Sequence, residues 1–383
     1  MATSICIVLV AISLRPGLVS VGPLLPAIRS EFGLSHAGGS LLIAVPDLLM
    51  GLLALPTPWL AQRFGRNRLV LAALVVLTLA ILARAFVHTT STLLITTVGV
   101  GAGIAISGAL VGGFIKASFP GRAALLTSIY ATSLGVGSMM SAGLSGPISA
   151  FSGSWRVGVG IWSLLAAVAV LVWLFIERKE RLAPPTRSNP NRRPLPFRVG
   201  LAWLIGLFFA CDNFLFYACL SWMATIYREH GFDETRAGLT LATYTGAFIV
   251  ATPLAGALSR KIDRRIPLAI WAMVMLVGLV LLAFAPLLAP HLAVLLIAFG
   301  IAGGFTLGMT LPLDNADNPE DATAWSAFVL TIGYVIAAAG PFSVGLLRDL
   351  TGNFSIPLWV LVAVGLLMLG LTPFLKPRSY AGG

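Results

Sequence analysis

The sequence predicts an all-α membrane protein in which twelve transmembrane helices form two pseudo-symmetric six-helix bundles, and three observations predict it. Of the 383 residues, 58% are hydrophobic and only 10% are charged. The charges cluster between apolar stretches of about 20 residues, the length that crosses roughly 30 Å of hydrocarbon. One long polar stretch near the middle divides the apolar stretches into two equal sets.

Clusters of charge and breaks at glycine or proline set the expected ends of each helix. In the first half, spans are expected at residues 3–27, 38–62, 69–88, 91–116, 122–148 and 155–176. In the second half, they are expected at residues 199–224, 235–258, 266–286, 291–313, 322–347 and 355–375. The first apolar stretch has no basic leader, so we expect it to be a spanning helix and not a cleaved signal.

The distribution of lysine and arginine predicts that both termini lie in the cytoplasm. Eighteen of the 25 basic residues fall in the loops after the even-numbered spans or in the C-terminal tail. Because cytoplasmic loops are enriched in Lys and Arg, we place these loops inside. One of them, LDNADNPEDA at 313–322, is acidic and departs from this pattern.

The polar stretch ERKERLAPPTRSNPNRRPLPFR is rich in proline and arginine and lacks helical periodicity, which is typical of a linker. The expected units are therefore an N-terminal bundle at 1–176, a cytoplasmic linker at 177–198 and a C-terminal bundle at 199–383. A shift of 198 residues aligns QRFGRNR (62–68) with RKIDRRI (260–266). Transporters are often built from such duplicated bundles.

The loops after the second helix of each half resemble those of the major facilitator superfamily, and the similarity extends along essentially the whole chain. That superfamily's signature has a glycine, then Asp-Arg and Gly-Arg, then further basic residues. The first-half loop, PWLAQRFGRNR, has Pro58 and Gln62 in place of the glycine and the acid. The second-half loop, GALSRKIDRR, keeps Gly256 and the basic run. The resemblance implies a cytoplasmic gate formed by Arg63, Gly65, Arg66, Arg68, Asp263 and Arg264.

A narrower resemblance is carried by three features of the sequence. They are LRPGLVSVGPLLP at 14–26, Arg84 late in the third span, and IGYVIAAAGPFSVGLLRDLTGNF at 332–354. These are similar to the cyanate and 2-nitroimidazole transporter family. The resemblance implies a secondary active transporter in a bacterial inner membrane that moves a small anionic or planar polar solute by alternating access. Coupling to protons, the direction of transport and the choice of solute stay open.

Arg15 lies about twelve residues into the first span and therefore close to the bilayer midplane. Insertion of an arginine there costs roughly 2.5–3.5 kcal/mol, so its guanidinium must face protein or water. One interpretation is that it points into a central cavity and binds the substrate through its planar fork. The alternative is a buried ion pair with Asp47 or Asp212, the two acids near the middles of their spans. Either acid is also a candidate proton carrier.

Polar and aromatic side chains in other spans are candidates for the same cavity. The 198-residue shift places Asn213 opposite Arg15, and Tyr217 shares a helix face with Asn213 because the two are four residues apart. They would orient a polar ligand, or else form hydrogen bonds between helices. Arg84 is a candidate for substrate contact, although the third helix is usually peripheral in this fold. Flat rings suit a flat substrate or pack against neighbouring helices, and the candidates are Tyr130, Phe305, Trp325 and Tyr334.

Other classes of function find little support in the sequence. The four histidines have no metal-ligand spacing, and no phosphate-binding loop is present, so we expect no metal, no cofactor and no enzymatic activity. The net charge of +11 is spread over short loops, which argues against nucleic-acid binding. The expected partners are a small solute and membrane lipid, and the chain is expected to be a monomer. An integral-membrane enzyme and a channel remain the alternatives.

Overall fold

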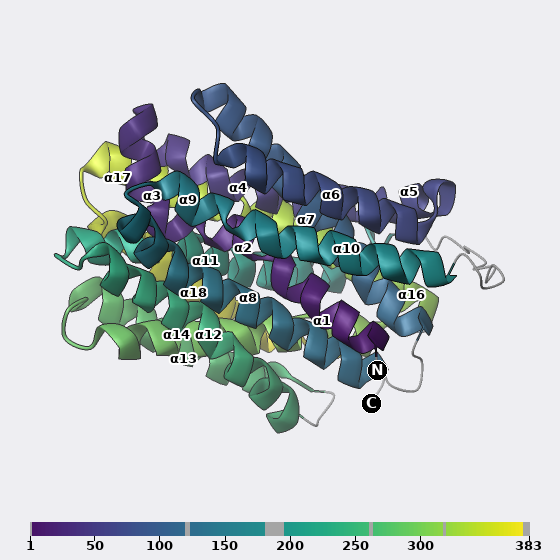
Figure 1. The fold of residues 1–383 in the computed structure, drawn as a ribbon. Coiled ribbons are helices and arrows are strands. Elements are labelled where there is room, and N and C mark those ends of the chain that lie inside the picture. The colour runs from purple at the N-terminus through teal and green to yellow at the C-terminus, as the bar shows by residue number, and fades with distance from the viewer. Residues whose placement is uncertain (1, 119–122, 181–194, 260–262, 317–318, 378–383) are drawn as a thin grey trace.

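The computed structural model describes residues 2–118, 123–180, 195–259, 263–316 and 319–377, and its elements are helices (Figure 1). The predicted all-α architecture is confirmed. The first three spans are α1 (Ala2–Leu14) with α2 (Pro16–Val19) and α3 (Val21–Phe32), then α4 (His36–Ala54) with α5 (Thr57–Phe64), then α6 (Arg66–Arg84). The next three are α7 (Thr90–Ser118), α8 (Ala123–Ser152), and α9 (Trp155–Gly160) with α10 (Trp162–Glu180).

The second half repeats this series of spans. It begins with α11 (Gly200–Glu229), α12 (Glu234–Leu258) and α13 (Arg265–Phe284). It continues with α14 (Pro290–Gly308) and α15 (Leu311–Asn315), α16 (Pro319–Ala337) and α17 (Ala339–Thr351), and α18 (Ser355–Leu371) with the 3₁₀ turn η2 (Thr372–Phe374). In the described residues, 11 of these spans are long and apolar enough to cross a membrane. The remaining one, α8, has 30 residues and rises about 45 Å, which is also long enough.

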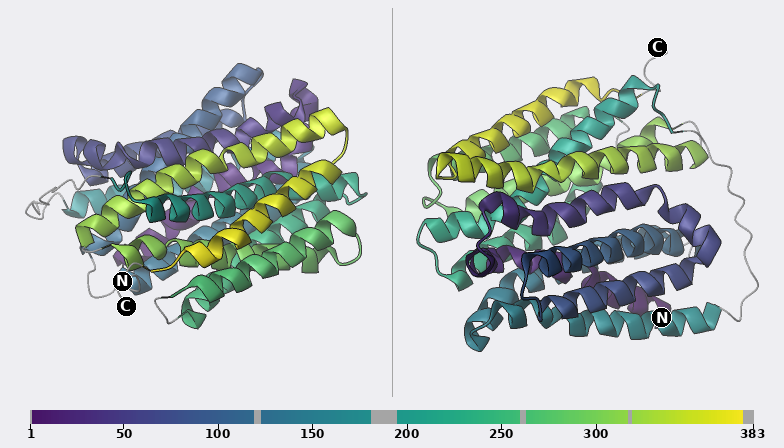
Figure 2. Two further views of the ribbon diagram at one scale, coloured as in Figure 1. Left: turned by 180° about the vertical axis from the view of Figure 1, so that it is seen from behind. Right: turned by 90° about the horizontal axis from the view of Figure 1, so that it is seen from above.

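Helix contacts follow the expected pseudo-symmetry. Within the halves, α6 packs on α7 and α13 packs on α14, which are the third and fourth spans of each half. Between the halves, α4 packs on α16 and α17, while α8 packs on α12. Exchanging the halves converts the first of these interfaces into the second, because it pairs the second span of one half with the fifth of the other. The two bundles therefore meet along two equivalent seams (Figure 2).

The outer helices present apolar side chains to the surroundings. Leu79, Leu171, Ile270 and Leu366, on α6, α10, α13 and α18, are each more than half exposed. Such a surface is costly in water but matches hydrocarbon, and helices satisfy their own backbone hydrogen bonds there. These four helices therefore contribute to the lipid-facing surface.

The two ends of the bundle differ in composition. The start of α1, the α5–α6 turn and the end of α10 lie at one end (Figure 1). We call it the arginine-rich end, since it carries Arg63, Arg66, Arg68, Arg264 and Arg265. The opposite end, called the His36 end, holds the α3–α4, α11–α12 and α17–α18 turns.

Several helices extend beyond their predicted spans. The first span was expected to end at residue 27 but α3 continues to Phe32, and α11 continues five residues past the expected residue 224. Helix α3 ends at Gly33, which takes a left-handed conformation with φ of 62°, and α4 begins after Ser35, whose side chain accepts a hydrogen bond from the N–H of Gly38. Most of the predicted linker, 181–194, lies outside the described residues. The unit boundaries at 176 and 199 stay predictions.

Candidate functional site

The first span is interrupted at Arg15, and the interruption follows from the neighbouring proline. Pro16 has no N–H, so the carbonyl of Ile12 loses its helical hydrogen-bond donor. This carbonyl lies against Gly137 of α8, where a Cβ would collide with the oxygen. Helix α1 therefore ends at Leu14 and α2 begins at Pro16, with Arg15 at the junction.

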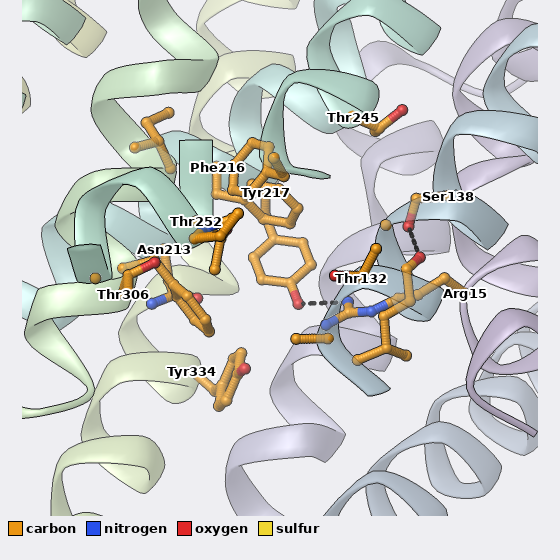
Figure 3. A pocket seen from close by; sticks show the side chains of 18 residues that line it. Arg15, Thr132, Ser138, Asn213, Phe216, Tyr217, Thr245, Thr252, Thr306 and Tyr334 are labelled. Carbon is orange, nitrogen blue, oxygen red and sulfur yellow. Dashed lines mark hydrogen bonds between the residues drawn. The ribbon is translucent and has the colours of Figure 1, made fainter. Parts of the chain in front are cut away.

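A cavity of about 520 Å³ lies between the two halves, next to this junction (Figure 3). It has the size of an ordinary small-molecule site. In the part of the chain that the structure describes, Arg15 is the only charged residue that lines it. The first half contributes Arg15, Ala131, Thr132, Leu134, Gly135 and Ser138; the second contributes Asn213, Phe216, Tyr217, Thr245, Phe248, Thr252, Pro253, Gly256, Ile301, Phe305, Thr306 and Tyr334.

A hydrogen bond from Arg15 joins the two halves inside this cavity. Arg15 Nη1 donates to the hydroxyl of Tyr217 at 3.1 Å (Figure 3). Tyr334 and Tyr130 also lie within electrostatic reach of the guanidinium. A tyrosine hydroxyl is a neutral acceptor, so the positive charge of Arg15 is not neutralised by this bond. The cavity therefore presents a cation that is hydrogen-bonded to a neutral group.

Aromatic rings form the wall of the cavity on the side of the second half. Ring centroids are 5.5 Å apart for Phe209 and Phe305, 6.3 Å for Tyr217 and Tyr334, and 4.8 Å for Phe216 and Tyr217. These distances are typical of favourable ring pairs. The rings give the cavity flat apolar faces beside the cation.

Small polar groups complete the lining of the cavity. The hydroxyls of Thr245 and Thr306 and the amide of Asn213 donate to carbonyls of their own helices, Leu241, Ala302 and Phe209 respectively. A hydroxyl that donates one bond keeps lone pairs that can accept another. These groups are therefore able to accept hydrogen bonds from an N–H or O–H of a solute.

Asp47 and Asp212 are buried away from the cavity lining. Each is 0% exposed, and neither carboxylate has a hydrogen-bond partner within the described residues. Neither carboxylate lies within ion-pair distance of the Arg15 guanidinium, although Asp47 is within electrostatic reach of Arg15. Asp212 lies beside Gly304 and Met368, inside the second half.

Three other candidates lie outside the cavity lining. Arg84 is 1% exposed and donates from Nη1 to the carbonyl of Gly17 at 2.9 Å and from Nη2 to Thr97 Oγ1 at 3.0 Å. Tyr130 precedes the lining residue Ala131, and Trp325 is 4% exposed within the core of the second half.

The candidate gate residues of the first half make contacts inside that half. Arg63 stacks over Trp59 at 5.5 Å, and Arg66 stacks over Phe114 at 5.2 Å. Arg68 Nε lies 3.8 Å from Glu177 of α10. Gly65, with φ of 86°, forms the sharp turn between α5 and α6, a conformation that favours glycine.

The candidate gate residues of the second half follow the same rule. Arg264 binds the carboxylate of Asp314, which belongs to the acidic loop that departs from the basic pattern. Asp263 pairs with Arg265 at 2.7 Å, and this guanidinium lowers the pKa of the Asp263 carboxyl. In the part of the chain that the structure describes, the contacts of the candidate gate residues thus lie within one half or the other.

The His36 end carries a charged cluster that the sequence analysis missed. Asp349 accepts from the backbone N–H groups of His36 and Ala37 at 2.8 Å each, and it also contacts His36 Nδ1 at 2.7 Å. Arg348 binds Glu229 at 3.0 Å beside it. The stretch LLRDL at 346–350 was noted only as part of a family resemblance. The signal that could have revealed the cluster is Ser35, a residue typical of helix starts. The first N–H groups after it, beginning with that of His36, need hydrogen-bond acceptors.

The sequence analysis also missed Phe216, Phe248, Thr245 and Thr252 in the cavity wall. Thr245 and Thr252 are seven residues apart and so share a face of α12, as Asn213 and Tyr217 share a face of α11. A search for such polar stripes in the eighth span could have found them.

Comparison with known proteins places this geometry in context. The sequence model described as Major Facilitator Superfamily matches residues 3–341. The chain is 30% identical over 371 residues to the cyanate transport protein CynX of Escherichia coli (strain K12), with 95% of each chain covered. It is also 30% identical over 369 residues to the 2-nitroimidazole transporter of the same organism, covering 94% of this chain and 92% of that one.

A solved structure supports the same fold. It is a bacterial homolog of the human lysosomal transporter Spinster in an inward-facing and occupied conformation, with a TM-score of 0.80 at 18% identity. The match covers 97% of this chain and 95% of that chain. At this identity the likeness shows the fold.

Proposed function

The chain belongs to the major facilitator superfamily and is a transporter, not an enzyme, and from this premise we propose that it is a secondary carrier for a small anionic or planar polar solute. It moves this solute by alternating access of one cavity to the two sides of a bacterial inner membrane. This proposal places both termini and the arginine-rich end in the cytoplasm.

The observation that carries this proposal is the contact between Arg15 and Tyr217 inside the cavity. The guanidinium is the one charge among the described lining residues, and it donates a hydrogen bond to the neutral hydroxyl of Tyr217 in the opposite half. An anion or a nitro group can replace that hydroxyl and accept two parallel N–H bonds. The solute then takes the place of a bond between the halves, which links binding to their relative movement.

The walls of the cavity support the same class of solute. Cyanate is a small anion and 2-nitroimidazole is a flat ring with an electron-rich nitro group, and both are substrates named for relatives at 30% identity. In this proposal Arg15 binds the negative end of the solute, Phe305 and Tyr334 cover its faces, and Asn213 and Tyr217 bind its polar edge.

The state of the structure fits one step of alternating access. Residues Pro253 and Gly256, near the arginine-rich end of α12, line the cavity, and a Cβ on Gly256 would meet open space. At the His36 end, the halves are joined by the Asp349 contacts. We interpret this as a state open to the cytoplasm, in which the candidate gate residues Arg63, Gly65, Arg66, Arg68, Asp263 and Arg264 stand apart in their own halves.

Transport assays in liposomes test the proposal. Liposomes that contain the purified protein and are loaded with unlabelled cyanate or 2-nitroimidazole should accumulate the labelled compound by counterflow. A channel does not show counterflow. No new compound should form, whereas an enzyme would produce one. Accumulation that follows an imposed proton gradient would support coupling through Asp47 or Asp212, and indifference to the gradient would argue against it.

Substitution of Arg15 tests the observation itself. Arg15→Ala should weaken solute binding by about 10- to 100-fold, the range expected for hydrogen bonds to a charged group. The matched control is Arg156→Ala, since Arg156 also lies in the first half but pairs with Glu31 near the His36 end. Normal affinity in Arg15→Ala, measured by calorimetry on folded protein, would remove Arg15 from the site.

A further inference from the structure

We propose that Arg84 is a positioning residue for Arg15: it holds the interrupted segment of the first span so that the Arg15 guanidinium reaches the cavity. Arg84 acts through the backbone and does not touch the solute. This inference rests on the proposed role of Arg15 in solute binding.

Arg84 is a buried cation, and the two acceptors of its hydrogen bonds in the described part of the chain are neutral oxygens. Its guanidinium donates to the carbonyl of Gly17 and the hydroxyl of Thr97, and in the described part of the chain no carboxylate lies within ion-pair distance of it. Placing an arginine in the apolar interior without an anion is costly. An ionisable residue in such a position indicates a specific function.

The carbonyl of Gly17 is available because the first span is interrupted a second time. Helix α2 ends at Val19 and α3 begins at Val21, so α2 consists of four residues only. The carbonyls in the last turn of a helix lack helical donors, and cationic side chains commonly bind them. Arg84 therefore supplies the hydrogen bond that a continuous helix would have supplied.

The bonded carbonyl is rigidly connected to Arg15. Gly17 is two residues from Arg15, and the N–H groups of Leu18 and Val19 both donate to the Arg15 carbonyl at 3.0 Å. A single turn held in this way moves as a unit. Fixing the carbonyl of Gly17 therefore also fixes the backbone from which the Arg15 side chain projects.

The same short segment is enclosed by neighbouring helices. A Cβ on Gly17 would lie 2.7 Å from Ile81 Cδ1 of α6, so a larger residue at position 17 would require the Ile81 side chain to shift. Ile81 and Arg84 are three residues apart and face the same way on α6. On the opposite side, Gly137 of α8 lies against the carbonyl of Ile12. In the described part of the chain, the bond from Arg84 is the only side-chain hydrogen bond to α2 (Pro16–Val19) itself.

Substitutions of two adjacent threonines can distinguish the positioning role of Arg84 from a general effect on packing. Thr96 and Thr97 are both buried on α7, and both hydroxyls bond to the carbonyl of Leu93. Of these two hydroxyls, only that of Thr97 also accepts a hydrogen bond from Arg84. Thr97→Val thus removes a partner of Arg84 with little change in shape, Thr96→Val is the matched control, and Thr97→Ser restores the hydroxyl.

Two readouts are measured on purified, folded protein. The first is the Kd for cyanate and for 2-nitroimidazole, which Thr97→Val and Arg84→Lys should raise about fivefold or more through the weakened charged hydrogen bond. The second needs no solute and is the amide exchange rate of residues 15–20, which should increase in the same variants. Thr96→Val and Thr97→Ser should match the unmodified chain in both.

A double-mutant cycle tests whether Arg84 acts through the position of Arg15. In a Tyr217→Phe background, which lacks the hydroxyl that binds Arg15, Thr97→Val should raise the Kd less than it does alone. Additive effects would argue against the proposal, as would unchanged Kd and exchange in both Thr97→Val and Arg84→Lys while Arg15→Ala abolishes binding. If the unmodified chain binds neither compound, the proposed function fails, and the exchange rates alone still decide whether Arg84 holds the segment.

Discussion

The two ends of the molecule hold their charges in opposite ways. At the His36 end, Asp349 of the second half binds the backbone that begins α4 in the first half. At the arginine-rich end, the ion pairs of Arg68 with Glu177 and of Arg264 with Asp314 each lie inside one half. The first arrangement breaks when the halves separate and the second does not. The contacts at the His36 end therefore depend on the relative position of the halves, and those at the arginine-rich end do not.

The chemistry of the His36 end explains how a few residues can hold the halves together. The first N–H groups of a helix have no partner within the helix, and their dipoles favour a negative charge. Ser35 satisfies one of them, at Gly38, from within the first half. Asp349 satisfies the two before it from the other half. Closing this end therefore completes the capping of α4, and opening it leaves two donors for water to solvate.

The largest effect is expected from a covalent lock on the closed side of the cavity. A Cβ built on Gly246 of α12 lies 4.0 Å from the Cβ of Met139 of α8, within the range for a disulfide. Because α8 and α12 form a seam between the halves, the pair Met139→Cys with Gly246→Cys should abolish transport when oxidised and restore it on reduction. The background replaces the buried Cys6, Cys211 and Cys219 with serine.

Each cysteine substitution alone is the control for this experiment, since a single thiol adds no link between the halves. Counterflow of labelled solute is measured before and after dithiothreitol. Undiminished transport by a fully oxidised double variant would show that this seam does not open during transport, and it would contradict the comparison between the two ends.

The sequence predicted more of the fold than of the contacts that govern it. The length and polarity of the apolar stretches set the twelve spans, because the hydrocarbon thickness imposes one length on every helix. Arg15, Asn213 and Tyr217 were found because an ionisable or polar side chain in such a span stands out. Asp349 and His36 were not found, since charged residues at helix ends are common and these two lie some 310 positions apart in the chain. Only the fold reveals which ends meet.

The next largest effect is expected from removing the carboxylate that caps α4. Asp349→Ala should destabilise the closed His36 end by about 1–2 kcal/mol, the usual cost of losing a side-chain cap, and so shift the ratio of the two states by about tenfold. The rate at which a membrane-impermeant thiol reagent added outside labels Ser138→Cys in the cavity should rise accordingly.

Asp233→Ala is a closely matched control for this substitution. Asp233 caps α12 at the same end through the N–H of Arg236 at 2.8 Å, but both groups belong to the second half. Its loss should lower stability without changing the labelling rate. Equal labelling rates in Asp349→Ala and Asp233→Ala would mean that capping across the halves does not control the equilibrium between the two states.

The smallest effect is expected at the arginine-rich end. Asp314→Asn removes the partner of Arg264 inside the second half, where the two side chains are 16% and 15% exposed. Because the pair moves with its own half, its loss should destabilise both states by the same free energy. A contact that contributes equally to two states does not shift the equilibrium between them. Thermal unfolding should show a loss of about 1 kcal/mol, while external labelling of Ser138→Cys should stay at the level of the unmodified chain. A labelling rate that fell by as large a factor as it rises in Asp349→Ala would show that Asp314 contacts the first half in the other state, and the two ends would then be alike in kind, each latched by carboxylates when it closes.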